Sequence, residues 1–306
     1  MEACSQRVAA RSDLKTLRSE LGERAWGDLA RLLDSGCTRA EWILLSFEAG
    51  ALADVLALTA PSEFNLPLEI IRLFGGLNPK NDFSLLLQQG IETAKSLGVT
   101  ELYCTVAEDS PDVSSLVQAG FCRWRKVVRF ESAGPTYLDL PGFRSIEAGN
   151  FTRAEIIALM EKTSERCCDS QIELYRQRLG GKADAEMTLQ MMESITYDPR
   201  WWRVALSGER ETVGIIFPVV AFGEPTIGYI GVIPDYRGRN IASFLLSEAW
   251  SLMERQGHST LSAEADERNV AMHRVLTKSQ FSRQPQKQEW RLETGVVRDE
   301  ALQGRQ

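Results

Sequence analysis

The stretch IGVIPDYRGRNIASFLL, from Ile230 to Leu246, combines an apolar strand pattern, a turn with proline, a loop rich in Arg and Gly, and a helix start. The first N–H groups of a helix have no intrahelical partner, and the helix dipole favours negative charge near them. Gly238 lets the main chain approach a ligand closely, while Arg237 and Arg239 add positive charge. The stretch therefore predicts a binding site for a pyrophosphate.

The residues before this stretch predict a strand, two helical regions and further strands. Thr152 and Glu155 have the spacing of a capping box, which predicts a helix over residues 153–165. A second helical region covers residues 172–194 and is interrupted by two glycines. Three apolar segments then read as successive strands: WWRVALSGE, TVGIIFPVVAFG and TIGYIGVIP.

The residues after it continue with a helix, a strand, a second helix and a closing strand. The first helix is expected over residues 241–256, with an apolar face and Gly257 as its stop. Strand LSAEA, helix 270–279 and strand KQEWRLE follow. The order predicts an α+β fold, a mixed and mostly antiparallel sheet flanked by helices.

The first half repeats the later part of this order in weaker form. The chain of 306 residues exceeds the usual single-domain length, which favours two domains. Pro79 aligns with Pro234 and Phe121 with Phe281 at a nearly constant offset. We expect a degenerate domain over residues 1–140 and a second domain over residues 141–306. Where the second half has its Arg/Gly loop, the first has only LNPKNDFSLLL, with a single Lys80.

Composition excludes several classes of function. The net charge of -7 and the lack of a basic block argue against nucleic-acid binding. No apolar run is long enough for a membrane span, and the N-terminus has no apolar signal region, so a cytoplasmic protein is expected. Only His258 and His273 are available as imidazole ligands, and the cysteines form no C-x-x-C pair, so no metal site is expected.

The Ile230–Leu246 stretch resembles the acetyl-CoA loop of the GNAT superfamily of N-acyltransferases. That pattern is Arg or Gln, two residues, Gly, one residue, then Gly or Ala; it falls here on Arg237, Asn240 and Ala242. Asn240 departs from the usual Gly, although Asn tolerates left-handed backbone angles better than most residues. The resemblance extends over the element order from Phe143 to Glu293. With the first half as a degenerate copy, it implies two tandem GNAT-like domains.

The resemblance implies acetyl-CoA as co-substrate and assigns residues to it. The strand edge would bind the pantetheine arm, the loop would bind the pyrophosphate, and Asn269 would reach the pantetheine region. The edge residues are Ile230, Gly231 and Val232; the loop residues are Arg237, Gly238, Arg239, Asn240, Ile241, Ala242 and Ser243.

Transfer to an amine requires a base for the ammonium and an acid for the leaving sulfur. Glu264, at the end of strand LSAEA, is the candidate base, although a solvent-facing strand Glu would look the same. Many relatives have a Tyr acid where this chain has Leu276. His273, one helical turn earlier, is a weak candidate acid, and Tyr229 and Tyr236 are alternatives. A further alternative is that the sulfur needs no side-chain acid and that water or the thiolate itself suffices.

Three readings remain from the sequence. The first is an N-acetyltransferase that acts by direct attack of a primary amine of a small molecule, with a tandem architecture resembling the mycothiol-synthase-like branch. The second is a non-catalytic acyl-CoA sensor or interaction protein, favoured by Asn240 and Leu276. The third is a structural duplicated α/β protein without CoA affinity. The identity of the amine, the acyl length and the oligomeric state follow no general sequence code.

Overall fold

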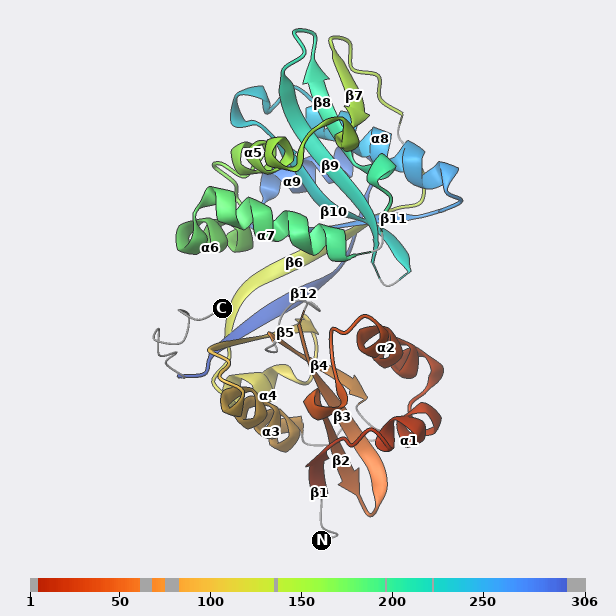
Figure 1. Ribbon diagram of the computed structural model, residues 1–306, viewed down its shortest axis with the longest axis vertical. Helices are drawn as coiled ribbons and strands as arrows, with labels where there is room; N and C mark the ends of the chain where they lie inside the picture. The colour runs from red at the N-terminus through yellow and green to blue at the C-terminus, as the bar shows by residue number, and fades with distance from the viewer. Residues whose placement is uncertain are drawn as a thin grey trace. The chain divides into compact units, whose positions relative to one another are not determined.

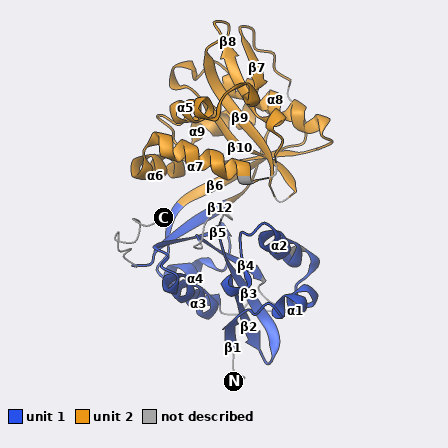
Figure 2. Cartoon of the chain, in the orientation of Figure 1, with its two compact units in different colours: residues 1–124, 287–306 blue, residues 125–286 orange. Residues whose placement is uncertain are grey.

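The computed structural model describes residues 5–60, 68–74, 83–134, 137–195, 197–221 and 223–295. The chain forms two compact units, which Figure 2 distinguishes by colour. Unit 1 comprises residues 1–124 and 287–306, and unit 2 comprises residues 125–286. Pro79 and Lys80, which the sequence comparison of the halves used, lie outside the described residues. Each unit is described by itself.

Unit 1 has a mixed sheet with helices on both faces (Figure 1). Its strand order is β1-β2-β3-β4-β5-β12, and β4 runs parallel to β5. Leucines of α1 and α2 pack on one face, and α3 and α4 pack on the other. The elements are β1 (Ser5–Val8), α1 (Asp13–Glu20), α2 (Glu23–Asp34), η1 (Ala40–Trp42), β2 (Ile43–Glu48), β3 (Ala51–Thr59), β4 (Glu69–Phe74), α3 (Phe83–Ser96), β5 (Glu101–Ala107), α4 (Val113–Gln118) and part of β12 (Ser282–Glu293).

Unit 2 repeats this plan in the order β6-β11-β10-β9-β8-β7 (Figure 1). Both halves of the sequence run strand, helix, strand, helix, strand from the strand that is parallel to its neighbour. The elements are β6 (Cys122–Ser132), β7 (Phe143–Glu147), η2 (Ala148–Asn150), α5 (Arg153–Thr163), α6 (Ser170–Leu179), α7 (Gly181–Ser194), η3 (Pro199–Trp201), β8 (Arg203–Ser207), β9 (Thr212–Ala221), β10 (Glu224–Val232), η4 (Pro234–Tyr236), α8 (Ile241–Arg255), β11 (Leu261–Asp266) and α9 (Val270–Lys278).

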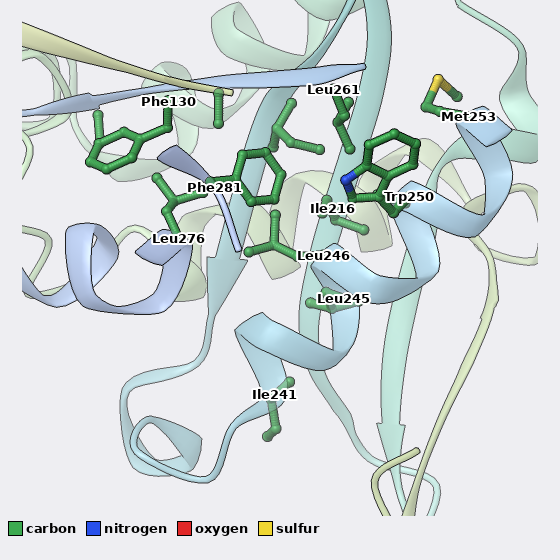
Figure 3. Close-up of a cluster of buried hydrophobic side chains, with 14 of the residues drawn as sticks. Phe130, Ile216, Ile241, Leu245, Leu246, Trp250, Met253, Leu261, Leu276 and Phe281 are labelled. Carbon is green, nitrogen blue, oxygen red and sulfur yellow. The ribbon is translucent and has the colours of Figure 1, made fainter. Parts of the chain in front are cut away.

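Helices cover both faces of the unit 2 sheet. Apolar residues of α5 and α7 pack against β8 and β9 on one face. On the other face, α8 and α9 pack against β11, β6 and the end of β10. Figure 3 shows the second cluster, in which Trp250 of α8 and Phe281 lie among leucines and isoleucines. This packing confirms the expected α+β class and fixes the frame on which the predicted site lies.

In unit 2, the start of α5 and the end of α8 agree with the sequence signals. The Thr152 side chain accepts from the Glu155 N–H, and the Glu155 carboxylate accepts from the Thr152 N–H. The predicted capping box is therefore present. Gly257 ends α8 with a φ of 85°. These local signals predict boundaries well because their hydrogen bonds join residues close in sequence.

The units divide the chain at residues 124 and 286 instead of near Leu140. In unit 2, β6 pairs with β11, although β6 belongs to the first half of the sequence. In unit 1, residues 287–293 of β12 pair with β5, although they end the second half. Each half therefore supplies one strand to the other half's sheet. No helix within the described ranges is both long enough and apolar enough to cross a membrane.

Candidate functional site

The predicted strand edge lies where β10 and β11 part. In the described residues, the two strands pair in parallel only at Thr226 with Ser262 and at Ile227 with Ala263. A register shift then follows on β10 between Ile227 and Tyr229. Beyond it β10 pairs with β9 alone, so its other edge is not covered by β11.

Alternation decides which groups of β10 face this open edge. The Ile233 N–H donates to the Val213 carbonyl over 2.9 Å, so the hydrogen-bonded pairs with β9 include Gly231. Ile230 and Val232 lie in the intervening pairs, and their N–H and C=O groups point away from β9. Ile230 thus offers its N–H and C=O to an extended ligand, and Val232 offers its N–H, because the Val232 carbonyl accepts from the Arg237 Nε.

Because Gly231 has no side chain, Thr163 of α5 and the Tyr229 hydroxyl can pack closely against β10. A Cβ on Gly231 would lie 2.6 Å from the Cβ of Thr163, the last residue of α5, and 3.2 Å from the Tyr229 hydroxyl. The Tyr229 hydroxyl lies 2.9 Å from the Thr163 Oγ1. Burial raises the pKa of the Tyr229 phenol far above its ordinary value. A hydroxyl that keeps its proton therefore lies directly beside the open part of β10.

The loop from Gly238 to Ser243 combines left-handed backbone angles with unbonded main-chain N–H groups. Gly238 and Asn240 have φ angles of 77° and 62°, so Asn240 takes the left-handed conformation in place of the usual Gly. The Asn240 side chain does not cap α8; its Oδ1 accepts from the Lys278 Nζ over 2.8 Å. Within the described part of the chain, the main-chain N–H groups of residues 238–243 have no hydrogen-bond acceptor.

Arg237 lies at the loop but is engaged with the protein itself. Its Nη atoms donate to main-chain carbonyls of the loop between α5 and α6, and its Nε donates to β10. The acceptors are Thr163 (3.0 Å), Glu165 (2.6 Å), Arg166 (2.9 Å) and Val232 (3.1 Å). Most of the guanidinium donors are therefore occupied, and the side chain ties the α5–α6 loop (residues 164–169) to the end of β10.

Two other cations lie near the loop. The Arg239 guanidinium lies 4.9 Å from the Tyr236 ring centroid and donates to the Asp235 carbonyl over 3.2 Å. Lys278, at the last position of α9, reaches Asn240 and was not predicted as a site residue. Its distance of 38 residues in sequence explains why no local pattern reveals it.

Asp266, at the end of β11, holds the other side of the α5–α6 loop. It is 1% exposed, and its Oδ2 accepts from the Ser170 N–H at the start of α6 over 2.9 Å. Its Oδ1 accepts from the Arg268 N–H over 2.8 Å. The carboxylate is thus satisfied by helix and turn N–H groups, and it anchors α6 at the carboxyl end of β11.

The side chains of the two predicted catalytic residues, Glu264 of β11 and His273 of α9, lie on opposite sides of β11. Glu264 is exposed and shares its face with Asp266, whereas its neighbours Ala263 and Ala265 lie in the core under α8 and α9. Glu264 lies opposite Arg129 of β6. The His273 ring packs on the other face, 5.2 Å from the Phe130 ring, and its Nε2 lies 3.0 Å from the Asp266 carbonyl. The structure therefore does not bring the two side chains together.

The position at which relatives have a Tyr acid is a core position here. Leu276 is 1% exposed and packs with Phe130 and Phe281, as Figure 3 shows. Tyr236 bonds to Glu211, away from the β10 edge. Asn269 is the N-cap of α9, where its Oδ1 accepts from the Met272 N–H over 3.1 Å.

No metal centre is formed by the described residues. Among residues 5–60, 68–74, 83–134, 137–195, 197–221 and 223–295, no group of three His, Cys, Asp or Glu side chains is placed to hold an ion. Cys167 and Cys168 both lie on the α5–α6 loop as free thiols. Burial raises the pKa of the Cys167 thiol, which disfavours the thiolate.

Comparison with known proteins identifies this region. Residues 181–281 match the family described as Acetyltransferase (GNAT) family. The matched segment runs from α7 through β10, the Gly238–Ser243 loop and β11 to the end of α9. This part of the chain is a GNAT acetyltransferase domain. None of the curated proteins matches the sequence.

Solved structures extend the likeness over almost the whole chain. A GCN5-related N-acetyltransferase from Sphaerobacter thermophilus has a TM-score of 0.66 at 16% identity, covering 95% of this chain and 96% of that chain. A tandem GNAT protein from the clavulanic acid biosynthesis pathway has a TM-score of 0.60 at 16% identity, with coverages of 97% and 100%. A putative acetyltransferase from Pyrococcus horikoshii has a TM-score of 0.53 at 14% identity, with coverages of 97% and 91%. The likeness shows the fold, a pair of GNAT-like units.

Proposed function

We propose that unit 2 binds acetyl-CoA and transfers the acyl group to a primary amine of a small molecule. The observation that carries the proposal is the parting of β10 from β11 directly before a loop of unbonded N–H groups. The open edge at Ile230 and Val232 offers hydrogen bonds to an extended amide chain. The N-terminus of α8, with Arg239 and Lys278 beside it, offers hydrogen bonds and positive charge to a pyrophosphate.

Direct transfer follows from this placement of the donor. The neutral amine attacks the thioester carbonyl and a C–N bond forms. The nitrogen gives up a proton, the C–S bond breaks, and CoA leaves as a thiolate that takes up a proton. An N–H of the β10 edge would stabilise the negative charge that develops on the carbonyl oxygen. The ammonium form of the amine has to lose one proton before attack.

Glu264 remains our candidate for the base that takes this proton, because it is exposed on the α6 side of β11. For the sulfur, the Tyr229 hydroxyl is a better candidate than His273. It lies beside Gly231 and keeps its proton. It donates over a long 3.3 Å to the Met160 carbonyl, and a turn of this hydroxyl would let it donate to the leaving thiolate instead. The His273 Nε2 is instead directed at the Asp266 carbonyl.

The alternative is an acyl-CoA sensor, in which the same edge and loop bind the ligand without transfer. The buried Leu276 favours this reading, because the position of the usual acid is filled by a core side chain. Turnover separates the two readings. Both bind acetyl-CoA, but only the enzyme consumes the thioester in the presence of an amine.

The test is mass-spectrometric detection of acylated products from acetyl-CoA and a panel of primary amines. Product detection avoids the background that exposed thiols such as Cys122 and Cys168 give with thiol reagents. We expect at least one amine to be acylated and Glu264→Gln to reduce kcat by about 100-fold. Glu267→Gln, a change at an exposed carboxylate of the next turn, should leave kcat unchanged. Acetyl-CoA binding without any product would favour the sensor.

A further inference from the structure

Asp184 on α7 is a buried carboxylate without a partner. The residue is 3% exposed, and among the described residues no group donates a hydrogen bond to its carboxylate or forms an ion pair with it. Its oxygens are not among the fully buried side-chain atoms that lack a partner, so they still reach the solvent. A buried carboxylate is normally paired or hydrogen-bonded, because the charge is otherwise costly to remove from water. Asp184 therefore differs from Asp266 and Asp169, whose oxygens are bonded to the start of α6.

The nearest cation is committed to other groups. The Arg176 guanidinium of α6 lies against Gly181 of α7, since a Cβ there would meet its Nη1 at 2.8 Å. Its Nη1 donates to the Glu161 carbonyl over 2.9 Å and to the Ser164 Oγ over 2.6 Å. Arg176 thus fixes the end of α5, and its charge reaches Asp184 only through space.

Asp184 lies on the side of unit 2 that faces the open part of β10. Its neighbour Ala185 belongs to the cluster against which Tyr229 packs, and the Tyr229 hydroxyl lies 2.9 Å from Thr163 and beside Gly231. The charged and titratable groups that interact with Asp184 are Arg176 of α6, Asp169 of the α5–α6 loop and Tyr229 of β10. Only Arg176 among these is a cation, so the surroundings leave the carboxylate uncompensated.

Burial raises the pKa of Asp184 to about 6, the Arg176 charge opposes the rise, and Asp169 adds to it. A cation placed against the carboxylate would reverse this effect. The burial of the Asp184 carboxylate and its lack of a partner are both reasons to expect a positively charged group from outside the chain.

We propose that Asp184 is a specificity-determining residue that binds the ammonium group of the acyl acceptor next to Tyr229. This rests on the proposed function and narrows it: the acceptor is a cation with an N–H donor, and neutral or anionic acceptors are excluded. The residue binds the acceptor; it lies on the opposite side of β10 from the α8 and α9 core, so acetyl-CoA binding does not depend on it.

The first test uses ethylammonium chloride as the probe on the full chain. At pH 7.5 and 100 mM probe, against equal sodium chloride, we expect the thermal midpoint of the wild type to rise by about 2 °C. Asp184→Asn should abolish the rise, and Glu186→Gln, which removes an exposed carboxylate of the same helix, should retain it. An equal rise in Asp184→Asn would overturn the proposal.

Stability without the probe provides a second readout. An unpartnered carboxylate destabilises the fold, so Asp184→Asn should be at least as stable as the wild type at pH 7.5. A clear loss of stability would mean that the carboxylate has a structural partner, and this too would overturn the proposal.

Kinetics then separate this inference from the proposed function. With an amine from the panel that is acylated, Asp184→Asn should raise KM for the amine about tenfold or more and leave the Kd of acetyl-CoA unchanged. Unchanged KM with normal acetyl-CoA binding would sink the role of Asp184 alone. Failure of the wild type to bind acetyl-CoA would sink the proposed function, while the ethylammonium result would still decide whether Asp184 binds a cation.

Discussion

The two units differ in the residue at equivalent turns. Helices α4 and α9 end in the same hydrogen-bond pattern, in which a Phe N–H returns to a Leu carbonyl over 3.0 Å. In unit 1 the left-handed position of this turn is Gly120, whereas in unit 2 it is Gln280, with a φ of 63°. A side chain in the left-handed region is strained, so unit 2 retains the turn at a cost in stability.

Gln280→Gly should therefore stabilise the protein. Removing the strain, offset by the greater freedom of Gly in the unfolded chain, gives an expected gain of about 0.5–1 kcal/mol in the free energy of unfolding. Urea denaturation followed by circular dichroism measures it. The reverse change in unit 1, Gly120→Gln, should destabilise. A loss of stability in Gln280→Gly would show that the Gln side chain makes a contact that outweighs the strain.

Asp184 gives stability a specific dependence on pH. Its pKa is raised to about 6 in the folded chain, so the folded state holds this proton at pH values where the unfolded state has lost it. Stability due to this group is thus full below about pH 4 and falls as the pH rises to about 6. The stability of Asp184→Asn relative to the wild type should increase over this range by on the order of 1–3 kcal/mol. Thermal unfolding at several pH values measures the difference; a constant difference would refute the raised pKa.

The role of a residue could be predicted from the sequence when its contacts are to residues close in the sequence. The sequence indicated that Asn240 would tolerate the left-handed angle, and it does, because that property is local. The partners of Arg237 lie some 70 residues away, so its charge suggested phosphate binding while its contacts are to main-chain carbonyls. Asp184 gave no signal at all, since a helical Asp is usually exposed.

At the scale of elements, the α5–α6 loop is held from two sides. Arg237 joins it to the end of β10, and Asp266 joins the following helix to the end of β11. These are the two strands that part at the open edge. The positions of the strand ends therefore determine where this loop lies.

Arg237→Ala should loosen the loop. Amide hydrogen exchange over residues 164–169 should become about tenfold faster or more, because several charge-assisted hydrogen bonds are lost. Arg239→Ala, which removes contacts with Asp235 and Tyr236 of the same loop, should leave exchange in residues 164–169 unchanged. Equal protection in Arg237→Ala and the wild type would show that Asp266 and packing hold the loop alone.

At the scale of the molecule, the sequence predicted the fold class and the repeated order of elements, since both rest on local patterns. It did not predict that β6 would join the sheet of unit 2 or that the end of β12 would join that of unit 1. The two strands occupy equivalent places in the repeat, so periodicity cannot decide which sheet each one enters. Strand pairing over such separations depends on tertiary packing.

We expect the N-terminus of α8 to bind the pyrophosphate of acetyl-CoA. Ala242→Asp tests it directly, because an acidic residue in the first turn of a helix is compatible with stability but repels a phosphate. Ala154→Asp makes the same change at the second residue of α5, another helix of unit 2, and is the matched control. The measurement is calorimetric titration of acetyl-CoA into the three proteins. We predict that the wild type and Ala154→Asp bind with equal affinity and that Ala242→Asp binds at least about tenfold more weakly. Equal binding by all three proteins, or no binding by the wild type, would contradict the account.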